Sequence, residues 1–283
     1  MRFELEIAPL DLDLTLGCGQ TFRWRRGPDG SWSGVLSESR VRLFKDGTVL
    51  AAEATPGDSD IAIQVEKFLR ARDDIARIQK ELRRDRTLAP GMARLRGLRI
   101  VKLDEWECLI SFILATYANI PRISKMVESL AAGYGRRISP GAYTFPDRRR
   151  LAKASERELA KLGLGYRARY VHEACATVDD EGLGRLLRMG YDDLRAGLIE
   201  LPGVGDKVAD CVSLFGFGRL EAFPIDVWME RALSRLYGQK GSYSKLRRFA
   251  SERFGRYAGY AQEYLYHNER LRAQGQACLF LEQ

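Results

Sequence analysis

The sequence has few of the side chains that bind metals or form disulfides. Among its 283 residues are two histidines and five cysteines, and the cysteines are far apart, with no Cys-x-x-Cys pair and no compact group of four. Disulfide frameworks, zinc sites and iron–sulfur clusters all require such groupings, so we expect none of them. The residues are Cys18, Cys108, Cys175, Cys211, Cys278, His172 and His267, and neither histidine is assigned a role.

Long hydrophobic runs are also missing. The longest stretch without a charged residue, 108–121, is fourteen residues long, short of the roughly 18 that a membrane-spanning helix needs. The first residues alternate charged and apolar side chains, so no secretory signal is visible. We therefore expect no membrane span and an intracellular protein, in the cytoplasm or nucleoid of a prokaryote or in the nucleus of a eukaryote.

The composition fits a folded chain with an anionic partner. Hydrophobic residues make up 45% and charged residues 30%, which excludes disorder as the main state. The length suits one large domain or two ordinary ones. The net charge of +8 mildly favours nucleic acid as a partner.

The first fifty residues have the pattern of antiparallel strands. Polar and apolar side chains alternate at 2–7, and the segments 21–24 and 31–36 flank a turn of glycine, proline and aspartate. Segments 41–45 and 48–50 flank an Asp-Gly pair, which is typical of a two-residue hairpin. These five segments predict an antiparallel sheet.

Helical spacing replaces this alternation from about residue 58, and we predict no strand beyond that point. Asp104 is expected to cap one helix, and Ser155 with Glu158 to form a capping box for another.

The predicted fold is therefore α+β. An N-terminal antiparallel β-sheet domain with a following helix is assigned to residues 1–100, and a larger all-helical region to 101–283.

The most informative stretch is Leu-Pro-Gly-Val-Gly-Asp-Lys at 201–207. Gly203 and Gly205 allow a tight turn with positive φ and the close approach of another backbone. The turn leads into a predicted helix N-terminus, whose unpaired amide groups attract phosphate. This is the physical basis of a helix-hairpin-helix, which holds the DNA backbone without reading its sequence.

Four ordered segments carry a family resemblance. The hairpin is followed by Pro-Ile-Asp-Val at 224–227, and the others are Gly-Gln-Thr-Phe-Arg-Trp at 19–24, Gly-Leu-Gly-Tyr-Arg at 163–167 and Ala-Gly-Tyr-Ala-Gln at 258–262. Together they resemble the 8-oxoguanine DNA glycosylases of the eukaryotic type, within the helix-hairpin-helix DNA glycosylase superfamily. The resemblance covers nearly the whole chain, to about residue 272.

The resemblance implies the catalytic residues. Lys207 would attack C1′ of the damaged nucleotide, and a helix N-terminus in a desolvated pocket favours the uncharged amine that this attack requires. Asp226 would stabilise positive charge that develops on the sugar, besides capping the next helix. Trp228 stands where the family usually has a histidine at a phosphate contact, and an indole donates one hydrogen bond but carries no charge.

The resemblance also implies a pocket for the flipped base. Gln262 would hydrogen-bond the Watson–Crick edge, Tyr266 would stack on one face of the base and Cys211 would cover the other. The backbone carbonyl of Gly19 would accept the N7 hydrogen that distinguishes 8-oxoguanine from guanine.

A wedge and a reader of the opposite base complete the implied DNA contacts. Tyr166 would enter the gap left by the flipped base, while Arg122 and Arg167 would receive the orphaned cytosine. Asn119 and Arg122 match the end of the family's Asn-Asn-Asn-Ile-x-Arg pattern, and Tyr117, at its first position, could fill the gap by stacking.

We therefore predict a monomeric, bifunctional DNA glycosylase and AP lyase. It would excise 8-oxoguanine from duplex DNA in base excision repair, preferably opposite cytosine, through a lysine Schiff base and with no metal or cofactor. One alternative is a superfamily member for oxidised pyrimidines or alkylated bases, of which the endonuclease III-like form typically has a C-terminal cysteine cluster and lacks the N-terminal sheet. A second is a non-catalytic DNA-binding module, which would need neither Lys207 nor Asp226.

Overall fold

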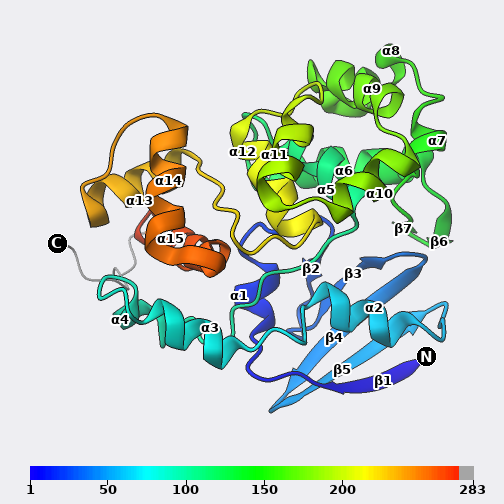
Figure 1. Ribbon diagram of the computed structural model, residues 1–283. Coiled ribbons are helices and arrows are strands. Elements are labelled where there is room, and N and C mark those ends of the chain that lie inside the picture. Colours follow the sequence, from blue (N-terminus) through cyan, green and yellow to red (C-terminus); the bar gives the residue numbers. More distant parts are fainter. Residues whose placement is uncertain (274–283) are drawn as a thin grey trace.

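The computed structural model describes residues 1–273 and shows an antiparallel sheet followed by helices (Figure 1). Five strands form the sheet in the order β1-β5-β4-β3-β2. They are β1 (Arg2–Glu6), β2 (Arg25–Arg26), β3 (Trp32–Leu36), β4 (Ser39–Asp46) and β5 (Val49–Thr55). The α+β prediction is confirmed, and so is the hairpin of β4 and β5. Asp46 pairs with Val49, however, so the two turn residues are Gly47 and Thr48 and not the predicted Asp46 and Gly47.

One predicted strand is wrong. Residues 21–24 have no regular secondary structure, and the short edge strand β2 follows them. The reason is burial on both sides: Phe22, Arg23 and Trp24 are all at most 5% exposed. The Arg23 guanidinium lies 3.4 Å from the Glu107 carboxylate. The segment fills the junction between the sheet and the helices, so it cannot present one polar face as an edge strand does.

The prediction that no strand follows residue 58 is also wrong. A small hairpin of β6 (Arg137–Ser139) and β7 (Ala142–Tyr143) forms a separate two-stranded sheet. Its turn contains Gly141, with φ +73°. A strand of two or three residues is too short to show a period of two, so the sequence pattern does not reveal it.

Helices make up most of the remaining chain. The α-helices are α1 (Leu12–Leu16), α2 (Ile61–Phe68), α3 (Ile75–Leu82), α4 (Ala89–Met92), α5 (Glu105–Leu114), α6 (Ile120–Tyr134), α7 (Arg148–Leu151), α8 (Glu156–Leu159), α9 (Arg167–Thr177), α10 (Asp180–Arg188), α11 (Tyr191–Ile199), α12 (Asp206–Cys211), α13 (Val227–Tyr237), α14 (Tyr243–Phe254) and α15 (Ala258–Ala273). Two π-helical turns, η1 (Ala160–Leu164) and η2 (Val212–Gly216), and one 3₁₀ turn, η3 (Gly255–Tyr257), continue or precede them. The predicted cap at Asp104 and the Ser155 capping box are confirmed.

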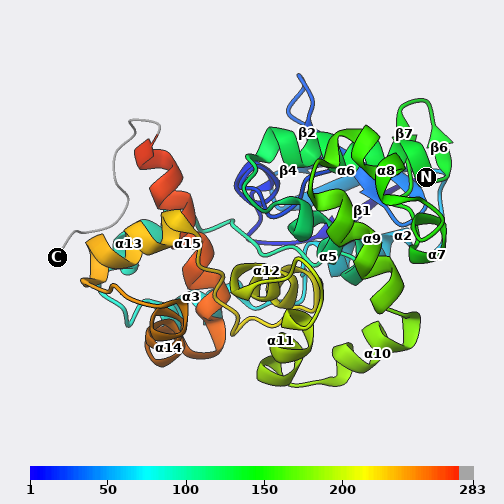
Figure 2. The same cartoon turned by 90° about the horizontal axis from the view of Figure 1, so that it is seen from above.

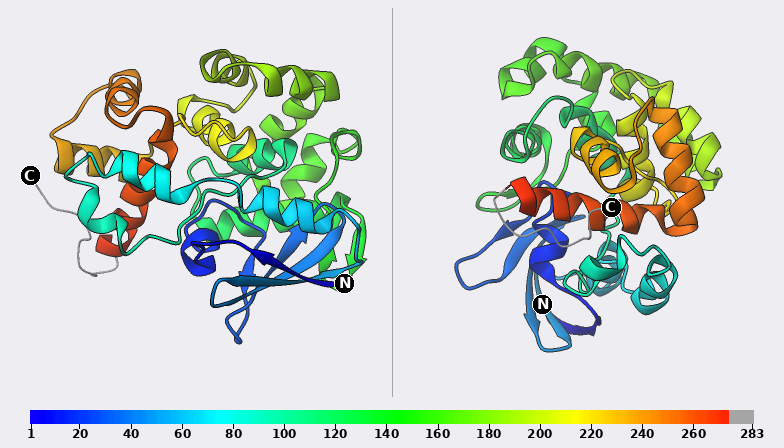
Figure 3. Two further views of the ribbon diagram at one scale, coloured as in Figure 1. Left: turned by 60° about the horizontal axis from the view of Figure 1, so that its bottom comes forward. Right: turned by 90° about the vertical axis from the view of Figure 1, so that its left-hand side faces the viewer.

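The helices form two groups with the sheet beside them. Helices α5 to α12 form one group, and α13 to α15 form the other, together with α3 and α4 (Figures 1 and 2). The last helix, α15, thus lies against helices of the first hundred residues (Figure 3). The Gln79 amide donates a hydrogen bond to the Tyr264 hydroxyl at 3.3 Å, and Tyr260 donates to Asp73 at 2.8 Å. The division at residue 100 stays a prediction.

The described residues contain no helix that is both long and apolar enough to cross a membrane. Four cysteines, Cys18, Cys108, Cys175 and Cys211, are buried free thiols. Cys278 lies outside the described residues.

Candidate active site

The glycine turn lies directly before α12, as predicted, but only one of its two glycines has a positive φ. Gly203 has φ +80°, and a Cβ there would lie 2.7 Å from the Cβ of Tyr170, so the position requires glycine. Gly205 has an extended conformation, with φ −95°, and is the N-cap of α12. The prediction of positive φ at Gly205 is therefore wrong. A Cβ at this position would meet no atom within 4 Å, which leaves the helix N-terminus open to a ligand.

Lys207 lies in the first turn of α12, as predicted. Its side chain is half-buried, and its Nζ lies 5.3 Å from the centre of the Phe112 ring. The buried Asp210 carboxylate holds the helix in place. It accepts hydrogen bonds from the hydroxyls of Tyr191 at 2.6 Å and Tyr243 at 2.5 Å. The helix that carries Lys207 is therefore held in place by α11 and α14.

Asp226 caps α13, as predicted. Its Oδ1 accepts the backbone N–H groups of Trp228 at 3.0 Å and of Met229 at 2.9 Å. Two hydrogen bonds hold the carboxylate in one orientation. The Trp228 ring packs under the guanidinium of Arg231, 5.2 Å from the ring centre.

Six predicted site residues meet in one small cavity of about 60 Å³. They are the two predicted catalytic and four predicted base-binding residues: Lys207, Asp226, Gly19, Cys211, Gln262 and Tyr266. The cavity adjoins a cleft of about 850 Å³, and the two share Gly19, Phe112, Lys207, Asp226 and Tyr266. The cleft is also lined by the predicted DNA-binding residues Asn119, Gly203, Gly205 and Trp228, and by Tyr117. The chain therefore brings the predicted lysine, aspartate and base readers to one place.

Two walls of the cavity present backbone and amide groups. Gly19 has φ +99°, and a Cβ there would lie 2.7 Å from Cδ1 of Ile120. Gln262 is 5% exposed, and its Oε1 has no hydrogen-bond partner among the described residues. An unpaired buried acceptor is costly, which is expected where a ligand completes the hydrogen bond.

Cys211 supplies an uncharged wall. Its side chain is 3% exposed, and burial raises the pKa of the thiol to about 12, although the nearby Lys207 lowers it. The thiol therefore keeps its proton at neutral pH and does not compete with the lysine as a nucleophile. Within residues 1–273, no group of three histidine, cysteine, aspartate or glutamate side chains is arranged to hold a metal ion.

Glu263 is a cavity residue that the sequence does not reveal. The side chain is 3% exposed, and it accepts a hydrogen bond from the Cys18 thiol at 3.5 Å. Burial raises the pKa of this carboxyl from 4.5 to about 7, against the lowering effect of Arg270. In the sequence, Glu263 looks like an ordinary helical charge, as Phe112 looks like an ordinary core residue.

This burial makes stability depend on pH through Glu263. The unfolded chain loses the proton near pH 4.5 and the folded chain near 7, so the folded form loses stability as pH rises through this range. We expect the unfolding free energy of the wild type, minus that of Glu263→Gln, to fall by about 2 to 3 kcal/mol between pH 5 and pH 8. Urea denaturation of both proteins at each pH measures it. A difference that stays constant with pH would show that the carboxyl is not held protonated.

The predicted wedge residues form a cluster around the carbonyl of Thr116. Tyr166 is 53% exposed and donates to this carbonyl at 3.3 Å. Tyr117 is 94% exposed and has φ +50°, a conformation that is unusual outside glycine and concentrates at functional sites. Arg167 is only 1% exposed, and its Nε donates to the same carbonyl at 2.9 Å. To make the predicted contact with cytosine, the Arg167 guanidinium would have to break its hydrogen bond to Thr116.

Asn119 and Arg122 begin α6. The Asn119 side chain caps the helix by accepting the backbone N–H of Arg122 at 3.1 Å. The Arg122 side chain is exposed. Of the two predicted readers of the opposite base, Arg122 is thus the accessible one.

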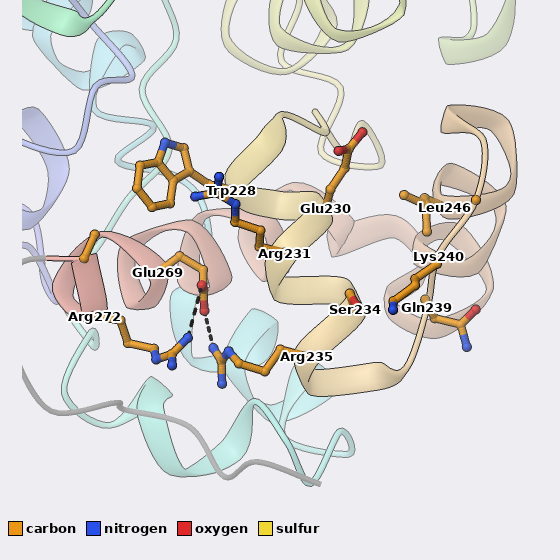
Figure 4. A pocket seen from close by; sticks show the side chains of 12 residues that line it. Trp228, Glu230, Arg231, Ser234, Arg235, Gln239, Lys240, Leu246, Glu269 and Arg272 are labelled. Atoms are coloured by element: carbon orange, nitrogen blue, oxygen red, sulfur yellow. Dashed lines mark hydrogen bonds and ion pairs between the residues drawn. The ribbon is translucent and has the colours of Figure 1, made fainter.

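A second cavity lies between α13 and α15 (Figure 4). It measures about 670 Å³, and Trp228 is the only predicted site residue that lines it. Figure 4 shows the buried Glu269 carboxylate paired with Arg235 and Arg272. Neither Lys207 nor any of the predicted base-binding residues lines this cavity, so we do not assign it as the reaction site, although it is larger than the cavity at Lys207.

Two family models match consecutive parts of the chain. The family model for the N-terminal domain of 8-oxoguanine DNA glycosylase matches residues 2–109. The model for the HhH-GPD superfamily of base excision DNA repair proteins matches residues 110–256.

Individual relatives extend the match over the whole fold. The N-glycosylase/DNA lyase OGG1 of Arabidopsis thaliana is 32% identical over 91% of this chain and 76% of its own length. The solved MBOgg1, in complex with a low-affinity DNA ligand, is 32% identical, with a TM-score of 0.90 and 96% of each chain covered. The 8-oxoguanine glycosylase/lyase of Clostridium acetobutylicum, with duplex DNA containing cytosine opposite 8-oxoG, is 28% identical, with a TM-score of 0.89 and 97% and 98% covered. By sequence and fold, the chain belongs to the 8-oxoguanine DNA glycosylase family of helix-hairpin-helix base excision repair proteins.

Proposed function

We propose that this chain is a monomeric, bifunctional DNA glycosylase and AP lyase that excises 8-oxoguanine from duplex DNA. The observation that carries the proposal is the convergence of Lys207, Asp226, Gly19 and Gln262 on one cavity beside a cleft. A phosphate clamp alone would not need a lysine and an aspartate beside a cavity lined by the predicted base-binding residues. The DNA complexes of the relatives support duplex DNA as the partner.

In the proposed reaction, the Lys207 amine attacks C1′ of the damaged nucleotide. The N–C1′ bond forms as the bond from C1′ to the base breaks, and the base leaves with the electron pair and takes up a proton. Loss of a proton from the bound nitrogen and opening of the sugar ring give the Schiff base. Removal of a proton from C2′ then expels the 3′ phosphate, which is the lyase step.

Asp226 acts by charge and position. Positive charge develops on the sugar as the base departs, and a carboxylate fixed by two backbone N–H groups stabilises it without having to reorganise. The α12 N-terminus at Gly205 faces open space, where its amide groups can bind a DNA phosphate.

The base is read from two edges. The carbonyl of Gly19 accepts the N7 hydrogen of 8-oxoguanine, and in guanine the lone pair on N7 would repel the same oxygen. The unpaired Oε1 of Gln262 accepts a hydrogen from the Watson–Crick edge. Tyr266 and Cys211 cover the two faces of the base.

Cytosine on the opposite strand is read by Arg122. We expect Arg122→Ala to reduce the preference for 8-oxoguanine opposite cytosine over adenine by about tenfold, because a guanidinium donates to the O2 and N3 acceptors of cytosine. Single-turnover excision from duplexes with each of the four opposite bases measures this ratio. Equal rates opposite all four bases in both proteins would remove the role of Arg122.

An incision assay across damaged duplexes tests the proposed substrate. The panel contains 8-oxoguanine, an oxidised pyrimidine, an alkylated base and an abasic site, each opposite cytosine. We expect rapid excision of 8-oxoguanine and cleavage of the abasic site. Faster excision of the oxidised or alkylated base would assign the chain to another branch of the superfamily, and binding without incision would make it a DNA-binding module.

A further inference from the structure

The buried Glu263 has no part in the reaction described above, although it lines the same cavity. It belongs to α15, the helix that also carries Gln262 and Tyr266. Its hydrogen bond crosses to the Cys18 thiol, next to Gly19 in the chain. Helix α15 therefore carries the proposed base contact Gln262, and its next residue, Glu263, contacts the segment that contains Gly19.

Arg270 makes a second contact from α15 to the same segment. Its Nη1 donates to the carbonyl of Gly17 at 3.2 Å and to the carbonyl of Cys18 at 2.5 Å. The guanidinium also lies 5.9 Å from the centre of the Tyr266 ring. Arg270 thus contacts both the segment before Gly19 and the aromatic wall of the cavity.

The segment needs such contacts because it has no regular secondary structure of its own. Gly17 is the C-cap of α1, and residues 18–20, which follow it, belong to neither a helix nor a strand. On its far side, the Gln20 side chain donates to the carbonyl of Arg99 at 2.9 Å and accepts from the backbone N–H of Val101 at 2.9 Å. Gln20 fixes the segment to the chain beyond α4, and α15 fixes it from the side of the cavity.

We propose that Glu263 and Arg270 are positioning residues that set the separation between the Gly19 carbonyl and the Gln262 amide. In the proposed function these two groups contact opposite edges of the flipped base, so the contacts that set their separation determine lesion specificity. This inference rests on the proposed roles of Gly19 and Gln262. The two residues need not touch the base and take no part in the chemistry at C1′.

The expected effect follows from hydrogen-bond geometry. Hydrogen bonds weaken steeply with distance and angle, and a displacement of about 1 Å can cost about a hundredfold in rate. Loss of either α15 contact frees the carbonyl of Gly19 to move relative to Gln262. The lyase reaction at a preformed abasic site involves no base, so it does not depend on this separation.

The test compares two substrates in the full-length protein. For Glu263→Ala we expect single-turnover excision of 8-oxoguanine opposite cytosine to fall by about tenfold to a hundredfold, while cleavage of a preformed abasic site stays within about threefold. Arg270→Ala is expected to show the same split. Glu263→Gln keeps an acceptor for the Cys18 thiol and should recover most of the excision rate.

Controls separate this effect from general damage to the fold. Glu252→Ala removes an exposed glutamate from α14 and should change neither rate. Cys18→Ala breaks the same contact from the opposite side and should reproduce the split even if Glu263→Ala does not fold.

The outcomes are distinct. If excision and lyase rates fall together in the variants, or if neither changes, the positioning role is wrong. If the wild type cleaves abasic sites but excises a base other than 8-oxoguanine, the proposed substrate is wrong. In that case the ratio of the excision rate for that base to the lyase rate, compared between wild type and variants, still tests the positioning role.

Discussion

Replacing Lys207 by glutamine is expected to abolish strand incision at 8-oxoguanine, by at least about a thousandfold in the single-turnover rate. Glutamine is close in size but offers no nucleophilic amine, so no bond to C1′ forms. Because the contacts to phosphate and base remain, binding of the lesion duplex should stay within a fewfold of the wild type. Quenched-flow incision and an electrophoretic mobility shift assay measure the two quantities.

A matched control uses a lysine outside the cleft. Lys80 is exposed on α3, and Lys80→Gln should incise at the wild-type rate. Retention of more than about a tenth of the activity in Lys207→Gln would mean that another group attacks the sugar.

Replacing Gly19 by valine is expected to reduce excision of 8-oxoguanine by about a hundredfold or more. A non-glycine residue at φ +99° is strained, and its Cβ would lie 2.7 Å from Cδ1 of Ile120, so the backbone must shift. The carbonyl would then miss N7, and an unpaired buried donor costs about 1 to 3 kcal/mol besides the strain. Lyase activity on a preformed abasic site should be much less affected. Gly184→Ala, in the middle of α10, is the matched control.

A base analogue tests the same contact without changing the protein. 7-Deaza-8-oxoguanine lacks the ring nitrogen donor, and we expect it to bind much more weakly than 8-oxoguanine. Equal binding of the two bases would show that Gly19 is not the discriminating contact, whatever the substrate of the enzyme.

The sequence predicts the local parts of the site. The glycine turn, the first-turn position of Lys207 and the cap at Asp226 all depend on residues a few positions apart, where helix-capping and turn rules apply directly. Gly205 differs because an N-cap is satisfied by an extended backbone, and positive φ is needed only at Gly203.

The parts that depend on distant contacts are not predictable in this way. The Cys18–Glu263 hydrogen bond joins residues 245 positions apart, and neither residue stands out in its own segment. Arg167 matches a family motif at an exposed helix start, yet tertiary packing buries it against Thr116. Burial on both sides likewise overrides the strand pattern at Phe22 and Trp24.

Borohydride trapping on a lesion duplex tests the central claim most directly. The claim is that Lys207 forms a Schiff base with C1′, and borohydride reduces such an imine to a stable amine. We predict a covalent complex of the wild type with DNA containing 8-oxoguanine opposite cytosine, no complex with undamaged DNA or with Lys207→Gln, and an adduct that peptide mapping places on Lys207. A complex that persists in Lys207→Gln, or an adduct on another residue, would contradict the account.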